Sequence, residues 1–204
     1  MNSSLATLAV VVAAYLVGSI SFAVVISRLF DLPDPHSYGS GNPGATNVLR
    51  TGNKTAAALT LLGDGLKGYV AVAVANVLGI SWGDASLATA GAALAVFLGH
   101  LFPIYHRFAG GKGVATAAGI TFALAWQLGL ALCVVWLLAA LLSRMSSVAS
   151  LAAAVTAPLL GIYILGNWPE AWALFPIAAL LIWRHRGNMR KILAGDERRI
   201  GHKS

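Results

Sequence analysis

Long apolar segments constrain the fold of this chain more than any other feature. Only 10% of its residues are charged, whereas a soluble domain averages about a quarter. A helix needs about 20 apolar residues to cross a bilayer. Segments that meet or approach this length are Leu5–Ile26, Ala56–Ile80, Ser86–Phe102, Ser147–Gly166 and the shorter Ala171–Trp183. The sequence therefore predicts an all-α polytopic membrane protein, which we expect to form one membrane-embedded domain over residues 1–204.

The first apolar segment is expected to be a retained transmembrane helix. Cleavable signal peptides begin with a positively charged region, and no Lys or Arg precedes Leu5. A further segment, Val114–Leu142, is long for one crossing and short for two, and it is interrupted only slightly by Gln127 and Gly129 near its middle.

The distribution of basic residues predicts the topology. Basic residues occupy the connections Arg28–Lys54 and Pro103–Gly113, the short turn at Arg144, and the tail after Trp183, whereas the connections near Ser81–Asp84 and Asn167–Glu170 carry only acidic residues. The positive-inside rule assigns every basic connection to the cytoplasm. Both ends of Val114–Leu142 are then cytoplasmic, so this segment crosses twice or forms a re-entrant hairpin that turns near Gln127. Two crossings give about seven transmembrane helices, with the N-terminus outside and the C-terminus in the cytoplasm. A single tilted span is the alternative, and it would leave the basic tail outside.

Several function classes are not supported by the sequence. The net charge of +7 is better explained in a membrane protein by topology and anionic lipids than by nucleic acid. The single cysteine, Cys133, lies in an apolar segment and excludes a disulfide framework. The sequence has no His-Glu-x-x-His or Cys-pair metal pattern, no Gly-x-Ser-x-Gly elbow, and no histidine followed five residues later by aspartate. We expect no cofactor and no metal.

The stretch from Gly39 to Arg50, GSGNPGATNVLR, is polar and glycine-rich. Successive amides in such a stretch can form an anion-binding nest, and Arg50 carries a guanidinium fork that matches phosphate. Side-chain donors come from Ser40, Asn42, Thr46 and Asn47, and Gly41 lies among them. The spacing of its glycines resembles a dinucleotide fingerprint, but that motif requires a preceding strand. A flexible linker, with Arg50 and Lys54 as membrane anchors, is the alternative interpretation.

A second stretch, GGKGVAT from Gly110 to Thr116, has the same character. It is not a Walker A motif, because Gly113 follows Lys112 where that motif needs Ser or Thr. It leaves Lys112, with Gly111 before it, on a permissive backbone at the start of a helix, and helix N-termini bind anions. Two such loops on one face favour phosphate binding over simple anchoring.

Three ionisable residues fall within expected spans. Asp64 and Lys67 are three positions apart, on one face of a helix. Charges inside a bilayer are costly and mark function by default, and both pairing with each other and contact with a ligand remain open for these two. His100 could serve as a base or as a capping donor. His36 and His202 are assigned no role.

Four motifs together resemble the acyl-phosphate:glycerol-3-phosphate acyltransferase family, PlsY, of bacterial inner membranes. They occur in order across nearly the whole chain and are GSGNPGATN (39–47) with Arg50, GHLFPIYHRFAGGKGVAT (99–116), SSVAS (146–150) and RHRGNMRKILAGDE (184–197). The resemblance implies seven helices with the N-terminus outside and an active site facing the cytoplasm. It also implies attack of the sn-1 hydroxyl of glycerol 3-phosphate on acyl phosphate, giving lysophosphatidate and inorganic phosphate. The residues that it assigns to catalysis and substrate binding are Ser40, Arg50, Lys112, Ser150, His185 and Asn188, with Asn42 and Lys54 added.

Two routes for proton transfer fit this chemistry. His185 could be the general base. Alternatively, a substrate phosphate oxygen takes the hydroxyl proton, and the protein supplies positioning and charge stabilisation. We favour the second route, because phosphate is already a good leaving group. The acyl chain would lie between helices beside membrane lipids, and no obligatory protein partner is implied.

Two other function classes compete with an enzyme. A transporter or channel for phosphate or phosphoesters would use the Asp64–Lys67 pair as a coupling element, although no convincing internal repeat is present. A lipid-interacting scaffold without activity is the third class. Phosphate release that depends on both substrates would separate the enzyme from both alternatives.

Overall fold

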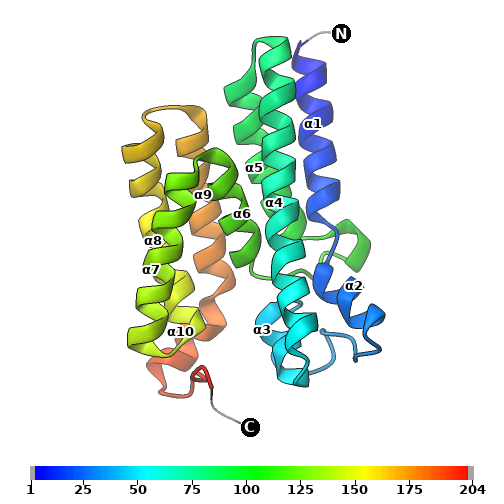
Figure 1. The fold of residues 1–204 in the computed structure, drawn as a ribbon, viewed down its shortest axis with the longest axis vertical. Helices are drawn as coiled ribbons and strands as arrows, with labels where there is room; N and C mark the ends of the chain where they lie inside the picture. Colours follow the sequence, from blue (N-terminus) through cyan, green and yellow to red (C-terminus); the bar gives the residue numbers. More distant parts are fainter. Residues whose placement is uncertain (1–2, 202–204) are drawn as a thin grey trace.

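The computed structural model of the protein describes residues 3–201, so Lys203 of the basic tail lies outside it. Every regular element within these residues is a helix (Figure 1). The α-helices are α1 (Ser3–Gly18), α2 (Phe22–Leu29), α3 (Ala45–Val48), α4 (Lys54–Trp82), α5 (Ala85–Leu101), α6 (Val114–Leu124), α7 (Trp126–Ser143), α8 (Ser146–Leu165), α9 (Pro169–Arg184) and α10 (Arg186–Leu193). Two 3-10 turns, η1 (Leu49–Thr51) and η2 (Ile104–His106), lie in the connections.

The all-helical membrane architecture is confirmed, whereas the number of crossings is not determined. Helices α4, α5, α7 and α8 are long and apolar enough to span a bilayer, and the bent pair α1–α2 makes a fifth candidate. Helix α6 has 11 residues, or about 16 Å at the usual helical rise, and is short for a bilayer of about 30 Å. The observed helix boundaries lie within three residues of the predicted ones for α4, α5, α8 and α9.

The first predicted span is not one continuous helix. α1 ends at Gly18, and α2 starts at Phe22 after a bend of 42°. Ser21 caps α2 by accepting the Val24 N–H at 3.4 Å. The Ile20 carbonyl, which no helical N–H reaches, accepts from Lys67 Nζ at 2.6 Å. These tertiary contacts stabilise a break that the apolar pattern of residues 5–26 does not reveal.

The ambiguous segment 114–142 forms two helices. α6 ends at Leu124, and α7 starts at Trp126 after an extended Ala125, two residues from the predicted turn at Gln127. In Figure 1, α6 rises beside α4 and α7 returns beside α8. Whether this pair crosses the bilayer completely stays a prediction.

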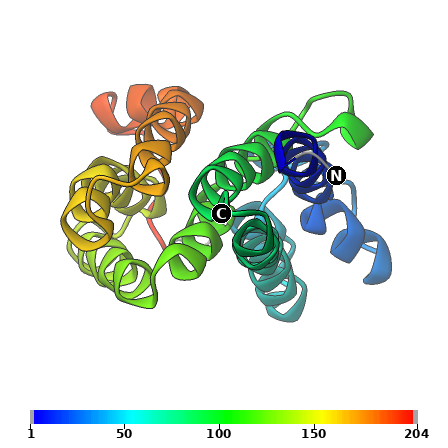
Figure 2. The ribbon, with the colours of Figure 1, turned by 90° about the horizontal axis from the view of Figure 1, so that it is seen from above.

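The helices form two groups that meet in the middle of the molecule. Viewed from above, α7, α8 and α9 gather on one side and α1, α2 and α4 on the other, with α5 and α6 between them (Figure 2). The main apolar core includes Val72, Val96, Phe97, Ile120 and Leu181, contributed by α4, α5, α6 and α9. Close approach at the centre depends on small residues: a Cβ on Gly18 would meet the Val96 carbonyl oxygen at 2.2 Å.

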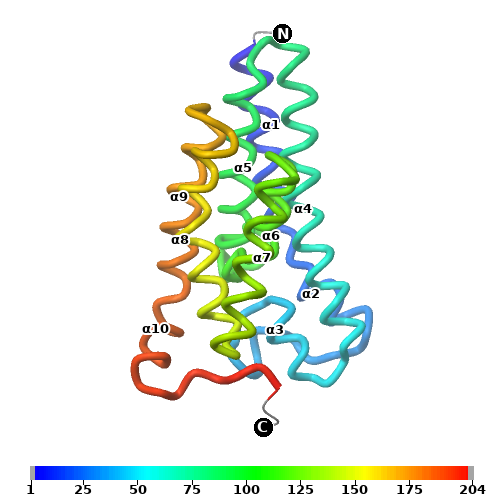
Figure 3. Tube along the Cα trace, turned by 60° about the vertical axis from the view of Figure 1, so that its left-hand side comes forward, coloured from blue at the N-terminus to red at the C-terminus, as the bar shows by residue number. Residues whose placement is uncertain are grey.

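The two ends of the molecule differ in charge. The N-terminal end holds the acidic turns, where Thr7 donates to Asp84 at 3.3 Å and Ser86 donates to Glu170 at 2.6 Å. Helices α2, α3 and α10 and the C-terminal segment lie at the opposite end (Figure 3). The segregation of acidic from basic connections that the sequence predicts is therefore present in three dimensions.

Candidate active site

A chain of hydrogen bonds joins side chains from four parts of the protein. Lys112 Nζ, from the connection before α6, donates to Asn188 Oδ1 of α10 at 2.5 Å. Asn188 Nδ2 donates to Glu197 Oε1 of the C-terminal segment at 2.7 Å, and Ser147 Oγ of α8 donates to the same oxygen at 2.7 Å. The fold thus brings the predicted residues Lys112 and Asn188 into direct contact beside a carboxylate.

The first glycine-rich loop is organised around the buried side chain of Asn47. Its Oδ1 accepts from the Ser40 N–H at 2.9 Å, from Ser40 Oγ at 3.2 Å and from Arg50 Nη1 at 3.3 Å. Its Nδ2 donates to the Pro35 carbonyl at 2.8 Å and to the Tyr38 carbonyl at 3.2 Å. Because both ends of the amide are occupied within the loop, Asn47 holds Ser40 and Arg50 in place in this structure. Its direct contact with phosphate stays a prediction.

The second glycine-rich loop is fixed by Arg184. The guanidinium donates from Nε to the Gly111 carbonyl at 3.0 Å and also to the Gly110 carbonyl. Gly111 lies where no side chain fits, because an added Cβ would be 2.3 Å from His100 Nε2 and 2.8 Å from the Pro43 carbonyl oxygen. The backbone of this loop therefore packs directly on the first loop.

The ionisable residues within the helices form one buried network. Lys67 Nζ lies 2.8 Å from Asp64 Oδ1, and both side chains are almost completely buried. Thr116 Oγ1 donates to the Asp64 carbonyl at 3.0 Å and lies 3.1 Å from His100 Nδ1, which is 3.6 Å from Asp64 Oδ1. Since the Thr116 hydroxyl donates its proton to the Asp64 carbonyl, its oxygen accepts from His100 Nδ1–H. The pairing of Asp64 with Lys67 is observed, and His100 acts here as a buried donor that faces Gly111.

The histidine assigned to catalysis lies between α9 and α10. His185 is 2% exposed, and its Nδ1 lies 2.8 Å from the Leu181 carbonyl. A carbonyl only accepts, so Nδ1 carries the proton and Nε2 holds the lone pair in the neutral ring. Burial lowers the pKa of His185 to about 4, which keeps the ring neutral at physiological pH.

Cations surround the Glu197 carboxylate. Burial lowers the pKa of Lys112 to about 8, and the nearby charge of Glu197 opposes that shift while Arg50 adds to it. Burial also lowers the pKa of Arg50, which interacts electrostatically with Glu197 and Arg198. Lys112 and Arg50 therefore share one anionic neighbour although they come from different loops.

Within the described residues, the side chains of Ser150, Asn42 and Lys54 have no hydrogen bond to Lys112, Asn188 or Glu197. Ser150 Oγ donates to the Ser146 carbonyl at 2.7 Å and accepts from Trp136 Nε1 at 3.2 Å. Asn42 is half-buried in the first loop, and Lys54 is exposed at the first residue of α4. Gly41 adopts a left-handed conformation, with φ of 64°, beside Ser40. The roles expected of Ser150, Asn42 and Lys54 stay predictions.

Sequence reasoning missed four residues that build this region. The sequence alone assigns no function to Glu197, Ser147 or Arg184 and no role to His36. Arg184 looked like one of many topology cations, and the fold-back of the tail onto Ser147 has no local signature. The adjacent carboxylates of Asp196 and Glu197 in a basic tail are the one available signal for Glu197.

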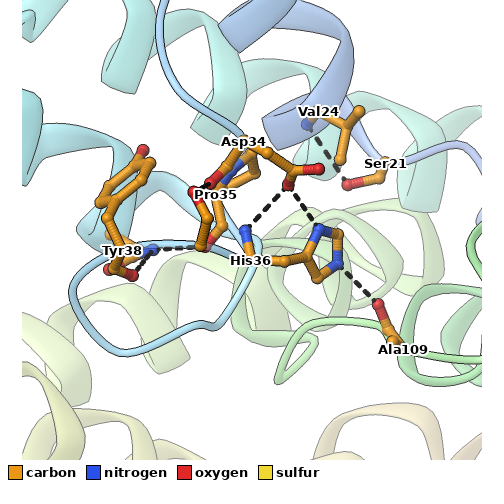
Figure 4. Close-up of polar contacts among 9 residues, drawn as sticks. Ser21, Val24, Asp34, Pro35, His36, Tyr38 and Ala109 are labelled. Carbon is orange, nitrogen blue, oxygen red and sulfur yellow. Dashed lines mark hydrogen bonds and ion pairs between the residues drawn. The ribbon is translucent and has the colours of Figure 1, made fainter.

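His36 connects the two loops. Its Nδ1 lies 2.7 Å from Asp34 Oδ1 and its Nε2 lies 3.0 Å from the Ala109 carbonyl oxygen (Figure 4). Ala109 directly precedes Gly110. The two glycine-rich loops are therefore joined by a side chain as well as by backbone packing.

Within residues 3–201, no three His, Cys, Asp or Glu side chains gather in an arrangement that could hold a metal ion. The donors of this region are instead cations, amides and hydroxyls, a set that suits phosphate oxygens.

The fold is that of a helical integral membrane protein. Its candidate site is rich in cationic and amide side chains, contributed mainly by the connections between helices. A family model described as glycerol-3-phosphate acyltransferase matches residues 8–195. The chain is 59% identical over 199 residues to a glycerol-3-phosphate acyltransferase of Cupriavidus necator, with 98% of each chain covered. It is 55% identical over 203 residues to that of Ralstonia nicotianae, with 100% of this chain and 98% of the relative covered.

A crystal structure of PlsY, an integral membrane glycerol 3-phosphate acyltransferase in its glycerol 3-phosphate form, matches with a TM-score of 0.88 and 39% identity over 96% of both chains. The chain therefore belongs to the glycerol-3-phosphate acyltransferase family and is a multi-pass membrane enzyme. This finding confirms the resemblance drawn from the four motifs, and it favours the enzyme over the transporter and the inactive scaffold.

Proposed function

We propose that the chain transfers a fatty acyl group from acyl phosphate to the sn-1 hydroxyl of glycerol 3-phosphate. The hydroxyl oxygen bonds to the acyl carbonyl carbon, the bond from that carbon to the phosphate oxygen breaks, and the hydroxyl proton leaves with phosphate. The products are lysophosphatidate and inorganic phosphate. The similar PlsY is described in a glycerol 3-phosphate form and in a lysophosphatidic acid form, which supports this substrate and this product.

The observation that carries the proposal is the arrangement of Lys112, Asn188 and Arg50 around an anion. Lys112 and Asn188 are joined at 2.5 Å, Asn188 donates to the Glu197 carboxylate at 2.7 Å, and Arg50 interacts with the same charge. Donors that satisfy a carboxylate also satisfy phosphate oxygens. Both substrates of this reaction carry phosphate, so a site of this composition matches them.

We assign phosphate binding to Lys112, Arg50 and Ser40, with amides of the two loops at Gly41 and Gly111. Asn188 orients Lys112 and offers its own amide donor. Ser150, Asn42, Asn47 and Lys54 keep the substrate-contacting roles that the family resemblance implies for them or the loop composition suggests. The buried network of Asp64, Lys67 and His100 supports the backbone of the second loop.

The substrate phosphate is the best acceptor for the proton of the attacking hydroxyl. A base with a pKa of about 4, as for His185, accepts a proton weakly, since effective general bases have pKa values near the working pH. A phosphate monoester has a second pKa of about 6, which matches the task better. His185 then orients the segment that carries Asn188, and the protein contributes positioning and charge stabilisation.

The topology that we propose has seven crossings in one domain over residues 1–204, with the N-terminus outside and the catalytic loops in the cytoplasm of a bacterium. The clustering of α2, α3, α10 and the basic tail at the end opposite the N-terminus supports this orientation. No cofactor and no protein partner are required by the proposed reaction.

The test uses purified protein in detergent or lipid. We expect phosphate release only when acyl phosphate and glycerol 3-phosphate are both present, with lysophosphatidate formed in equal amount. Release from acyl phosphate alone would indicate a hydrolase, and equal use of acyl-coenzyme A would refute the assigned donor. The Lys112→Ala variant is the matched control for release by contaminating enzymes.

A further inference from the structure

The contacts of the His36 ring require a proton on each of its two nitrogens. Nδ1 faces the Asp34 carboxylate at 2.7 Å, and Nε2 faces the Ala109 carbonyl at 3.0 Å (Figure 4). Both partners are acceptors only, and a neutral imidazole carries a single N–H. The two contacts are therefore both hydrogen bonds only when the ring is the doubly protonated imidazolium.

We propose that His36 is a positioning residue for glycerol 3-phosphate, which as an imidazolium fastens the Gly39–Arg50 loop to the Gly110–Lys112 loop. This inference rests on the phosphate-binding roles proposed above for Arg50 and Lys112. It adds a residue that does not touch substrate but sets the spacing between the two that do.

On the first loop, the effect of His36 passes through Asn47. The carbonyls that accept from Asn47 Nδ2 belong to Pro35 and Tyr38, which lie on either side of His36 in the chain. The other end of the same amide accepts from Ser40 and Arg50. A shift of the His36 turn is thus transmitted to the guanidinium that is expected to bind phosphate.

The turn that carries His36 is itself well defined. Asp34 Oδ1 accepts the His36 N–H at 2.9 Å, and the Asp34 carbonyl accepts both the N–H and the hydroxyl of Ser37, at 2.9 Å and 2.8 Å. A ring projected from such a turn holds its orientation relative to the backbone, so its bond to Ala109 also fixes the position of the second loop.

On the second loop, Ala109 is followed by Gly110 and Gly111, whose carbonyls accept from Arg184. Lys112 comes next. Arg184 holds this loop against α9, and His36 holds it against the first loop. Loss of the His36 bond removes the side-chain link between the two loops and leaves backbone packing at Gly111 and the shared charge of Glu197 to set the spacing between Lys112 and Arg50.

Three charged or titratable groups lie near His36. Asp34 is the nearest, and the His36 backbone N–H holds the pKa of that carboxyl below its usual value, so it stays ionised. His106 of η2 lies 6.2 Å away between ring centroids, and Arg28 of α2 interacts with Asp34 and His106. The His36 side chain is 29% exposed.

The contacts predict the effect of removing the charged ring. Without an imidazolium at position 36, one of the two hydrogen bonds is lost and the loops lose their register. The KM for glycerol 3-phosphate should then rise about tenfold, the size expected for one partly exposed charge-assisted hydrogen bond. kcat should change much less, because the bridge acts on binding.

The experiment compares the KM for glycerol 3-phosphate and the kcat of wild type, His36→Arg, His36→Gln and the control His106→Gln at one pH. Arg keeps donors and charge, so His36→Arg should keep a low KM. His36→Gln should show the raised KM with a nearly unchanged kcat, and His106→Gln should match the wild type.

Two results would overturn the inference: a KM in folded His36→Arg that is raised as much as in His36→Gln, or a wild-type KM in folded His36→Gln. The Lys112→Ala variant distinguishes this failure from failure of the proposed site. Loss of activity in Lys112→Ala together with normal His36 variants defeats only the inference on His36, whereas normal kinetics in Lys112→Ala defeats the proposed site.

Discussion

Replacement of Lys112 by alanine tests the centre of the proposed site. Lys112 Nζ is half-buried and donates to Asn188 Oδ1 at 2.5 Å. Loss of a hydrogen bond to a charged partner costs about 1.5–3 kcal/mol, and about 1.4 kcal/mol corresponds to a factor of ten. We therefore expect kcat/KM for glycerol 3-phosphate to fall about ten- to hundredfold in Lys112→Ala, while the protein stays folded.

The same residue predicts a pH dependence with a defined sign. Burial lowers the pKa of Lys112 to about 8, so the cation that binds phosphate is lost as pH rises through about 8. In the wild type, kcat/KM should fall about tenfold per pH unit above that value, because this parameter reports the free enzyme. In the pH profile of kcat, this decline (the high-pH limb) should begin at a higher pH, because bound phosphate favours the ammonium form of Lys112.

Two further variants test whether Lys112 causes the high-pH limb. Lys112→Arg should lack the limb, because arginine stays protonated. Glu197→Gln should move the limb to lower pH, because the charge of Glu197 raises the pKa of Lys112.

The assay is initial-rate phosphate release from purified protein, with circular dichroism and size-exclusion chromatography as controls for folding. Near-normal kinetics in Lys112→Ala would return Lys112 to the role of a topology anchor. If kcat/KM of Lys112→Arg declined at high pH as in the wild type, the assignment of that decline to Lys112 would be refuted.

Three other predictions follow from the geometry. His185→Gln should keep a low-pH limb near about pH 6–7 in kcat/KM, because that limb belongs to the substrate phosphate; loss of the limb and of about 10²–10⁴-fold in rate would identify His185 as the base. Gly111→Ala should raise the KM for glycerol 3-phosphate more than it lowers thermal stability, because its Cβ would lie 2.8 Å from a carbonyl of the first loop; an unchanged KM would contradict this. In a Cys133→Ala background, a cysteine at Gln127 should be labelled from outside and one at Ser146 only from the cytoplasm, and cytoplasmic labelling of both would disprove two full crossings.

The extent of the helices could be predicted from the sequence because hydropathy is a local property. The long apolar segments delimit α4, α5, α8 and α9 closely. The break after Gly18 was not predicted, because it depends on Lys67 reaching the Ile20 carbonyl from another helix. Such a contact leaves no trace in the hydropathy of either segment.

The site could be predicted from the sequence where a cationic side chain and flexible glycines lie in the same short stretch. Glycines beside Lys112 and near Arg50 indicated anion binding without knowledge of the fold. Glu197 could not be found in this way, because its importance comes from the return of the tail to Ser147. Similarly, the role of Arg184 depends on its reach to the Gly111 carbonyl, 73 positions earlier in the chain.

The break between α1 and α2 bears on how the protein is assembled during synthesis. A carbonyl without a partner in a bilayer costs several kcal/mol, and lipid offers no donor to replace Lys67. The ammonium of Lys67 is equally unsuited to lipid before it reaches Ile20 and Asp64. Neither the first hydrophobic segment nor α4 is therefore stable in the membrane by itself in its final form. We therefore expect the two to associate during membrane insertion, so that insertion and packing of this half are coupled.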